Sequence, residues 1–309
     1  MFGKSSNSSI LNFIGRRFDD VVISGNAVAI RLRRELVGAT PQQIRGAIEG
    51  MSRLNPGRFG GNLDYKEIEG VRCGVVNFQG ITNDKKRILW AHGGAFSFGS
   101  ARVYKATATF LAKALKCEVI IPEYRLAPEF PYPAAIDDLF KVYSSLKQSE
   151  QGELFLVGDS AGGNLASCLV SKLIKEKIQV PDKLALLSPW MDLSKKSKSN
   201  IQNSSDFSPF DNLDTVAFSR DYMGTMDDKD PLVSPVFGSF KGFPPTHIQG
   251  SHVEFLFLDA ESTLKAMEAD KVQTTTHWES KALHGWHLLP DILPEAKRSM
   301  QEVANFLLK

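Results

Sequence analysis

The chain has 309 residues, 42% of them hydrophobic and 23% charged, which is the composition of an ordinary soluble globular protein with enough length for a sizeable core. A formal net charge of +2 provides no strong attraction for a polyanion, so we expect no nucleic-acid partner. The three cysteines, Cys73, Cys117 and Cys168, are widely spaced and predict neither a disulfide framework nor a metal site. They favour a reducing compartment.

The sequence also disfavours a location in or beyond a membrane. It contains no stretch of 18 apolar residues, the length that a membrane-spanning helix needs. Residues 1–17 lack the apolar segment and the cleavage site of a secretory signal peptide. We therefore expect a cytoplasmic protein without a membrane span.

From about residue 70 onward, short apolar segments alternate with segments of helical periodicity. The expected strands are Val71–Phe78, Arg87–Ala91, Glu118–Pro122, Leu154–Val157, Leu184–Leu187, Thr246–Gln249 and Gln273–Trp278. The expected helices are Arg102–Lys116, Ala134–Lys147, Ala161–Lys177, Ala260–Ala269 and Pro294–Leu308. Unbroken apolar runs at 119–121 and 154–157 are typical of strands that are buried on both faces. The alternation predicts a doubly wound α/β domain with a mostly parallel sheet.

Two regions depart from this alternation. Residues 1–60 contain helix-like segments without a convincing buried strand, and residues 194–230 are polar and then helical around Asn212–Tyr222. Open α/β sheets bind ligands at the carboxyl ends of their strands. We therefore predict that 1–60 and 194–230 form a discontinuous helical cap over that edge, and that 61–193 and 231–309 form the core.

The stretch LFLVGDSAGGNLA, residues 154–166, combines an apolar strand, a Gly-Asp-Ser-Ala-Gly turn and a helical segment. The pattern G-x-S-x-G places its serine, Ser160, on a tight strand-to-helix turn. Gly158 and Gly162 allow the close approach of strand and helix that this turn requires. At the helix N-terminus, free N–H groups favour negative charge. We predict that Ser160 is a nucleophile and that the Ala161 N–H stabilises an oxyanion; a glycine-rich turn that binds phosphate is the alternative.

A serine hydroxyl becomes a good nucleophile when a base takes its proton and a carboxylate orients that base. On this type of turn the acid and then the histidine follow the serine along the chain. His247 and His277 fall inside expected strands and are expected to pack or to lie on the surface. His284, in ALHGWHLLP, follows the last strand and precedes the final helix, so we prefer it as the base. His287 is expected to pack beside the two leucines that follow it.

The acid is expected in the segment THIQGSHVEFLFLDAES, which follows the penultimate strand. Glu254 comes soonest after that strand and is the first choice. Asp259 is the second choice, and Glu261 is a further option, but both approach or enter the next helix. A carboxylate on that helix is expected to cap it or to face solvent.

Six motifs in order resemble the hormone-sensitive lipase family of α/β-hydrolase carboxylesterases, from about residue 85 to residue 309. These motifs are HGGAFSFGS (92–100), EYRLAPEFPYPAAIDD (123–138), GDSAGGNLA (158–166), SPWMDLS (188–194), DPLVSPVFG (230–238) and LHGWHLL (283–289). The resemblance implies an eight-stranded core with a helical cap and a Ser–Asp/Glu–His triad. It also implies ester hydrolysis without a cofactor or a metal.

By the same resemblance, the N–H groups of Gly94 and Ala95 complete the oxyanion hole with that of Ala161. His92 then braces the loop together with Gly93. The sequence departs from the family at the third glycine of its H-G-G-G motif, where Ala95 keeps the backbone N–H. It departs again at the acid, which is commonly Asp and here is Glu254.

These observations predict a serine carboxylesterase that hydrolyses short- to medium-chain esters of small molecules. Four phenylalanines could line its acyl pocket: Phe96, Phe98, Phe207 and Phe210. An amide, carbamate or acetyl-group hydrolase with the same triad is one alternative, and a non-catalytic binding protein on the same fold is another. Relatives of this kind often form homodimers through the edge of the last strand, so a homodimer is compatible with the resemblance.

Overall fold

A computed structural model describes residues 40–52, 61–78, 85–149, 152–194 and 215–309. In this part of the chain, one sheet has the strand order β1-β2-β4-β3-β5-β6-β7-β8. The strands are β1 (Asn62–Ile68), β2 (Val71–Asn77), β3 (Lys86–Ala91), β4 (Glu118–Pro122), β5 (Glu153–Asp159), β6 (Lys183–Leu187), β7 (Thr246–Ser251) and β8 (Thr274–Glu279). β2 is antiparallel to both of its neighbours, and the remaining pairs are parallel.

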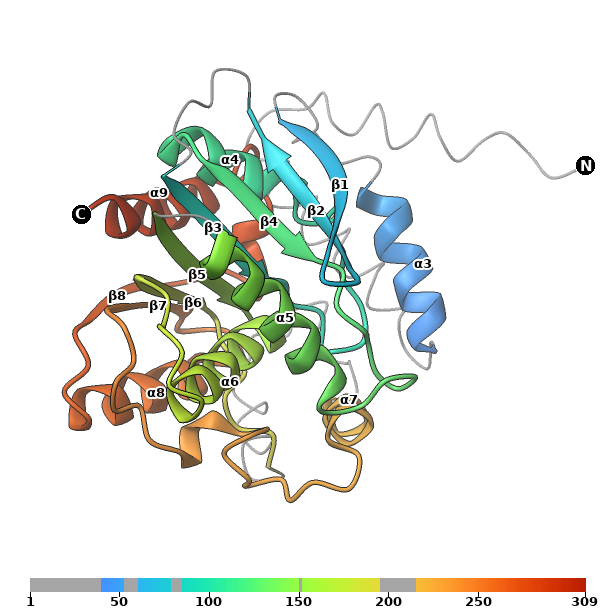
Figure 1. The fold of residues 1–309 in the computed structure, drawn as a ribbon, viewed down its shortest axis with the longest axis vertical. Coiled ribbons are helices and arrows are strands. Elements are labelled where there is room, and N and C mark those ends of the chain that lie inside the picture. The colour runs from blue at the N-terminus through green and yellow to red at the C-terminus, as the bar shows by residue number, and fades with distance from the viewer. Residues whose placement is uncertain (1–39, 53–60, 79–84, 150–151, 195–214) are drawn as a thin grey trace, which may run out of the picture.

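Helices cover both faces of this sheet (Figure 1). They are α3 (Pro41–Ser52), α4 (Lys105–Leu115), α5 (Ala134–Ser149), α6 (Ala161–Lys175), α7 (Thr215–Met223), α8 (Phe257–Ala269) and α9 (Pro294–Leu308), with 3-10 turns η3 (Pro235–Phe237) and η4 (Trp286–Leu288). Buried side chains of α5, α6 and α8 share one hydrophobic cluster, and those of α4 and α9 share another. The helices thus form two layers with the sheet between them.

The apolar run of strand β5 is unbroken because the strand is buried on both faces of the sheet. Leu154 and Leu156 belong to the cluster on the α6 side, whereas Phe155 and Val157 belong to the cluster on the α9 side. All four side chains are fully buried. Because side chains alternate across a strand, burial on both faces demands an apolar residue at every position.

The predicted doubly wound, mostly parallel sheet is confirmed, and every expected strand is present. Helix α9 begins and ends where predicted, whereas α8 begins at Phe257 rather than Ala260. Strand β1 was not predicted. Its residues, NLDYKEI, are all exposed or half-buried, because β1 lies at one of the two edges of the sheet. With the charged residues Asp64, Lys66 and Glu67, β1 lacks the apolar run by which the central strands were predicted.

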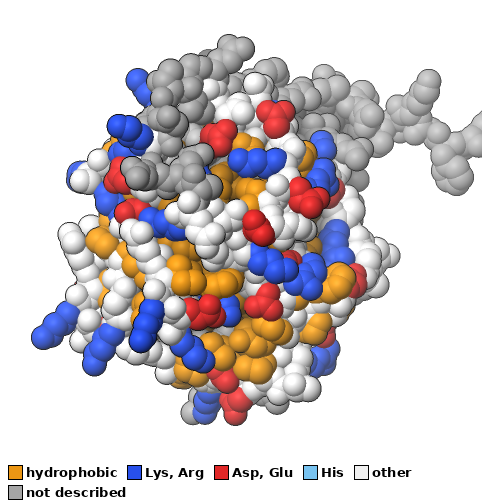
Figure 2. All heavy atoms as spheres, viewed as in Figure 1, with side chains coloured by type: hydrophobic (Ala, Val, Ile, Leu, Met, Phe, Trp, Pro, Cys, Tyr) orange, Lys and Arg blue, Asp and Glu red, His pale blue; other side chains and the backbone are white. Residues whose placement is uncertain are grey.

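Two described helices, α3 and α7, belong to the regions predicted as a cap, and residues 1–39, 53–60 and 195–214 of those regions lie outside the described part. Both helices contact the loop after β3: Arg45 of α3 donates to the Ser97 carbonyl, and Tyr222 of α7 stacks on Phe96. The division into cap and core stays a prediction. None of the helices in the described ranges is long and apolar enough to cross a membrane. On the described surface in Figure 2, acidic and basic side chains are interspersed, which fits the small net charge.

Candidate active site

The loops after five parallel strands meet at one edge of the sheet. Strands β3, β5, β6, β7 and β8 run in the same direction, so their carboxyl ends share an edge. The loops after β3, β5, β7 and β8 contain the predicted residues Gly94 and Ala95, Ser160, Glu254 and His284, in that order. The sheet topology therefore brings polar residues from distant parts of the sequence to the edge at which open α/β sheets bind ligands.

Ser160 occupies the turn between β5 and α6 in a strained backbone conformation, with φ of 51° and ψ of −124°. Such a conformation costs about 1–3 kcal/mol and persists only where surrounding contacts hold it. Here the Ser160 N–H donates to the Leu187 carbonyl at 2.9 Å, and the Ser160 carbonyl accepts from the Trp190 N–H at 2.9 Å. The turn has the form of a nucleophile elbow, which lifts the hydroxyl away from the backbone.

Close packing behind this turn accounts for its flanking glycines. A Cβ at Gly162 would collide with the carbonyl oxygens of Ala91 and His92, and one at Gly158 would collide with the carbonyl of Gly162. Any side chain at either position would push strand and helix apart. The predicted reason for both glycines therefore holds in the structure.

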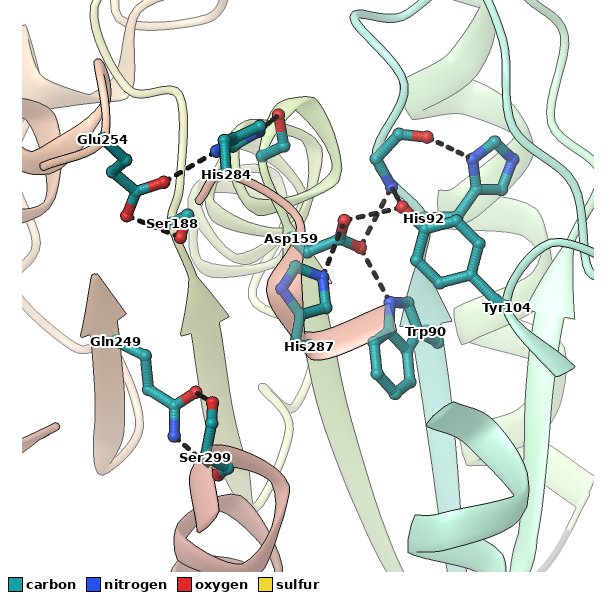
Figure 3. Close-up of polar contacts among 12 residues, drawn as sticks. Trp90, His92, Tyr104, Asp159, Ser188, Gln249, Glu254, His284, His287 and Ser299 are labelled. Carbon is teal, nitrogen blue, oxygen red and sulfur yellow. Dashed lines mark hydrogen bonds and ion pairs between the residues drawn. The ribbon is translucent and has the colours of Figure 1, made fainter. Parts of the chain in front are cut away.

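His284 connects Ser160 to a buried carboxylate (Figure 3). Its Nε2 lies 3.0 Å from Ser160 Oγ, and its Nδ1 lies 2.7 Å from Glu254 Oε2. The Glu254 side chain is fully buried, and that of His284 is 7% exposed. The first-choice serine, histidine and acid are thus brought together with the spacing that a serine–histidine–acid relay requires.

The second oxygen of Glu254 is also held in place. Ser188 Oγ donates to Glu254 Oε1 at 2.7 Å, and the Ser251 N–H donates to the same oxygen at 2.8 Å. Ser188 follows β6 and is fully buried, with φ of 45°. Both carboxylate oxygens therefore have partners, which restricts rotation of the Glu254 side chain. Sequence reasoning did not identify Ser188 as a partner of the acid.

Asp259, the second choice for the acid, lies in the first turn of α8. Its Oδ2 accepts the N–H groups of Met191 at 2.8 Å and Asp192 at 2.9 Å. A carboxylate on this helix was expected to cap it or to face solvent; Asp259 is buried and accepts backbone N–H groups of another segment. It instead fixes the loop after β6, the loop that also provides Ser188.

The loop after β3 has an unusual backbone conformation. Three consecutive residues have positive φ: 120° at Gly94, 49° at Ala95 and 60° at Phe96. The Gly94 carbonyl accepts the N–H groups of Ser97 and Phe98, both at 2.9 Å, and thereby closes the turn. Within the described residues, the N–H groups of Gly94, Ala95 and Ala161 donate to no protein group.

His92 lies behind this loop, fully buried and stacked on Tyr124 with a ring centroid separation of 4.2 Å. Its Nδ1 is 2.8 Å from the Gly93 carbonyl, and Tyr124 Oη donates to the His92 carbonyl at 2.6 Å. Burial lowers the pKa of His92, which favours its neutral form. A neutral imidazole that hydrogen-bonds the loop can brace it.

A family model described as alpha/beta hydrolase fold matches residues 88–288. The chain belongs to the alpha/beta hydrolase family. The hydrolase is 30% identical to an esterase of Acinetobacter venetianus over 269 residues, which cover 86% of this chain and 88% of the relative. It is also 30% identical to an acetyl-hydrolase of Streptomyces hygroscopicus over 227 residues, which cover 72% of this chain and 76% of the relative.

Among solved structures, the hydrolase resembles an esterase from the bacterial hormone-sensitive lipase family. The TM-score is 0.84 with 27% sequence identity, and the match covers 92% of this chain and 96% of that esterase. A homologue of hormone-sensitive lipase from a metagenome library matches with a TM-score of 0.81, 28% identity, and coverage of 91% and 96%. The resemblance predicted from the six motifs is confirmed.

Asp159 and His287 form a second carboxylate–imidazole contact in the hydrolase, which sequence reasoning missed (Figure 3). His287 Nε2 lies 3.3 Å from Asp159 Oδ2, and both side chains are buried. The distance suits an ion pair, although the alignment is not that of a good hydrogen bond. His287 was expected only to pack beside leucines, and nothing in its local sequence indicates a partner so distant in the chain.

Of the four phenylalanines predicted for an acyl pocket, Phe207 and Phe210 lie outside the described residues. Phe96 and Phe98 are almost fully buried. Phe96 stacks on Tyr222 of α7 with centroids 3.8 Å apart, and Phe98 meets Phe218 of the same helix edge-to-face at 5.9 Å. Both residues thus join the loop after β3 to α7. A pocket-lining role for either of them stays a prediction.

Proposed function

We propose that the hydrolase is a serine carboxylesterase in which Ser160, His284 and Glu254 form the catalytic triad. The observation that carries the proposal is the continuous contact from Ser160 Oγ through both nitrogens of His284 to Glu254 Oε2. The relatives named as esterases support ester hydrolysis as the reaction class.

In the first half of the reaction, Ser160 Oγ attacks the ester carbonyl carbon while His284 Nε2 removes its proton. The carbonyl oxygen becomes an oxyanion. Gly94, Ala95 and Ala161 each offer it an N–H without a protein acceptor, and a well-placed donor of this kind is worth about 10²–10³ in rate. His284 then protonates the leaving alcohol, and the acyl group stays on Ser160.

In the second half, His284 takes a proton from a water molecule as that water attacks the acyl-enzyme. Collapse of the tetrahedral intermediate breaks the bond to Oγ, and His284 returns the proton to Ser160. Throughout the cycle, Glu254 holds Nδ1 and stabilises the imidazolium. Its contacts with Ser188 and Ser251 keep this carboxylate in the required orientation.

We further propose that the acyl group is short or medium in length. Phe96 and Tyr222 are stacked and buried beside the loop that provides the oxyanion donors, so bulky rings already occupy this side of the site. A hydrolase of acetyl groups is the second candidate, because the relative from Streptomyces hygroscopicus is named an acetyl-hydrolase.

The test is a series of p-nitrophenyl esters from acetate to dodecanoate, assayed on the wild type, Ser160→Ala and Ser167→Ala. Ser160→Ala should reduce kcat by about 10⁴–10⁶, because the nucleophile is lost. Ser167 lies in α6, the helix that follows Ser160, and its hydroxyl donates to the Gly163 carbonyl, so Ser167→Ala controls for loss of a buried serine. An organophosphate should label Ser160 in the wild type, and the short esters should react fastest.

Substantial activity in Ser160→Ala would contradict the proposed triad. So would an organophosphate adduct that forms on the wild type at a residue other than Ser160. Faster hydrolysis of acetanilides than of acetate esters would favour the amide-hydrolase alternative instead.

A further inference from the structure

The carboxylate of Asp159 lies at the meeting point of three segments of the site. It belongs to the residue before Ser160, yet its side chain points away from His284 and toward the loop after β3 (Figure 3). Its Oδ1 accepts the Trp90 Nε1–H and the Gly93 N–H, each at 3.0 Å. Asp159 is almost fully buried, so each of these contacts is shielded from solvent.

The other oxygen of Asp159 has two more neighbours. Tyr104 Oη donates to Oδ2 at 2.6 Å, and His287 Nε2 lies 3.3 Å from the same oxygen. Burial alone would raise the pKa of Asp159, but the interactions with His287, followed by those with Trp90 and Tyr104, outweigh it and lower that pKa below its ordinary value. A charged carboxylate is therefore kept within the site.

The contact between the Gly93 N–H and Asp159 requires a residue without a side chain. Its N–H also reaches Tyr104 Oη at 2.8 Å, so the amide is shared between Tyr104 and Asp159. A Cβ at Gly93 would collide with the Asp159 carboxylate and would stand 2.9 Å from Tyr104 Oη. The next two residues are Gly94 and Ala95, the proposed oxyanion donors. Asp159 thus joins the strand that ends at the nucleophile to the loop that provides those donors.

His287 connects the same carboxylate to the third segment. It lies in η4, three residues after His284, and its side chain is fully buried. Within the described residues, Nδ1 of His287 has no hydrogen-bond partner, so the Asp159 contact is the one polar contact that the ring makes. Burial of an imidazole with a single polar neighbour costs free energy, because two ring nitrogens are removed from water. A hydrocarbon side chain would fill the same space without that cost, so packing alone does not explain a histidine here.

We propose that Asp159 and His287 are positioning residues. They hold the loop with the proposed oxyanion donors Gly94 and Ala95 (the oxyanion loop), and the turn after His284, in the correct position relative to Ser160. The inference rests on the proposed function. His287 keeps the carboxylate oriented, and the oriented carboxylate fixes the Gly93 amide. Neither residue exchanges protons with the substrate. A shift of about 1 Å in catalytic donors can cost up to about 10² in rate, so such positioning has a measurable effect.

The test compares His287→Phe, His287→Gln and the control His247→Phe. His247 is another buried imidazole, which contacts Thr275 and Gln249 and stacks on Phe306 of α9. The readouts are kcat and KM for p-nitrophenyl butyrate, the inhibition constant of a trifluoromethyl ketone, and Tm. The ketone adduct carries an oxyanion and therefore reports on the donors directly.

We expect His287→Phe to lower kcat about tenfold, to change KM less than twofold, and to weaken the ketone by the same factor as kcat. His287→Gln keeps an N–H donor and should recover most of both losses. His247→Phe should leave kcat and the inhibition constant within twofold of the wild type, whatever happens to Tm. Tyr104→Phe removes another partner of Asp159 and should show the same losses as His287→Phe. This variant keeps the inference testable if His287→Phe does not fold.

Wild-type kcat and ketone affinity in a folded His287→Phe or Tyr104→Phe protein would overturn the inference. So would an equal loss in His247→Phe, because the effect would then follow from core damage alone. Failure of the proposed function is recognised separately, since Ser160→Ala would then keep its activity in the same assay.

Discussion

The two sides of Ser160 are built in different ways. On the relay side, the imidazole of His284 and the carboxylate of Glu254 are themselves the proposed catalytic groups. On the oxyanion side, the proposed donors are the backbone N–H groups of Gly94 and Ala95, and the surrounding side chains only hold the loop. A single side-chain substitution can therefore delete a relay group, whereas on the oxyanion side a change of a supporting side chain acts by displacing the backbone.

The largest effect is expected on the relay side. Glu254→Ala should lower kcat by about 10³–10⁴, because His284 loses the carboxylate that orients it and stabilises its cation. Asp259→Ala is the matched control, since it removes another buried carboxylate near the same loops. It should cost less than about tenfold in kcat while lowering Tm, because the amides of Met191 and Asp192 lose their acceptor. Measured kcat values that reverse this order would transfer the role of acid to Asp259.

A smaller effect is expected where α3 contacts the loop after β3. Arg45 donates from Nε to the Ser97 carbonyl at 2.6 Å and from Nη2 to the Ala127 carbonyl at 2.8 Å. Arg45→Met removes both contacts and should lower kcat/KM about three- to tenfold through displacement of the loop. Steady-state kinetics with p-nitrophenyl butyrate measures this change.

Glu129→Gln separates this effect from the ion pair on the surface. Arg45 binds Glu129 through two hydrogen bonds, which are the main cause that lowers the pKa of Glu129 to about 2. The pair therefore stays ionised over assays from about pH 5 to 9, and the loss in Arg45→Met should not vary with pH in that range. Glu129→Gln keeps the contacts of Arg45 with the loop and should stay near wild-type activity. An equal loss in both variants would show that the ion pair, not the loop contact, matters.

The smallest effect is expected at His92, the histidine nearest to the oxyanion donors in sequence. Because burial lowers its pKa, His92 is neutral at the pH at which esters are assayed. His92→Asn can replace Nδ1 in the contact with the Gly93 carbonyl, so kcat should fall only two- to threefold. The acid limb of the pH–rate profile should not move, because that limb belongs to His284. A shifted limb in His92→Asn would mean that His92 takes part in proton transfer.

Local signals account for most of what could be predicted. The strand β5, the turn at Ser160 and the start of α6 lie within a dozen residues, and their glycines and apolar periodicity are visible without any distant contact. Helix α9 was predicted with its observed bounds for the same reason. Strand β1 was missed because its pairing with β2, and not its own apolar content, makes it a strand.

Contacts between loops could be predicted only in part. The contact of Ser160 with His284, and of His284 with Glu254, could be predicted because an acid and then a histidine follow a nucleophile elbow along the chain. The partner of the acid, Ser188, was not found, nor was the contact of Asp159 with His287. A serine after β6 and a histidine after the base have no local feature that distinguishes them from packing residues.

The amino-acid sequence was enough to predict the fold class, the candidate nucleophile and the chain order of its proposed partners, because hydrophobic periodicity and turn glycines act over a few neighbouring residues. Three contacts follow only from the three-dimensional arrangement: Asp159 with the loop after β3, Asp259 with backbone amides, and His287 with a carboxylate. The physical reason is that the strand order of the sheet brings these loops to one edge. That order depends on which strands pair and pack in three dimensions, and no short stretch of the chain records it.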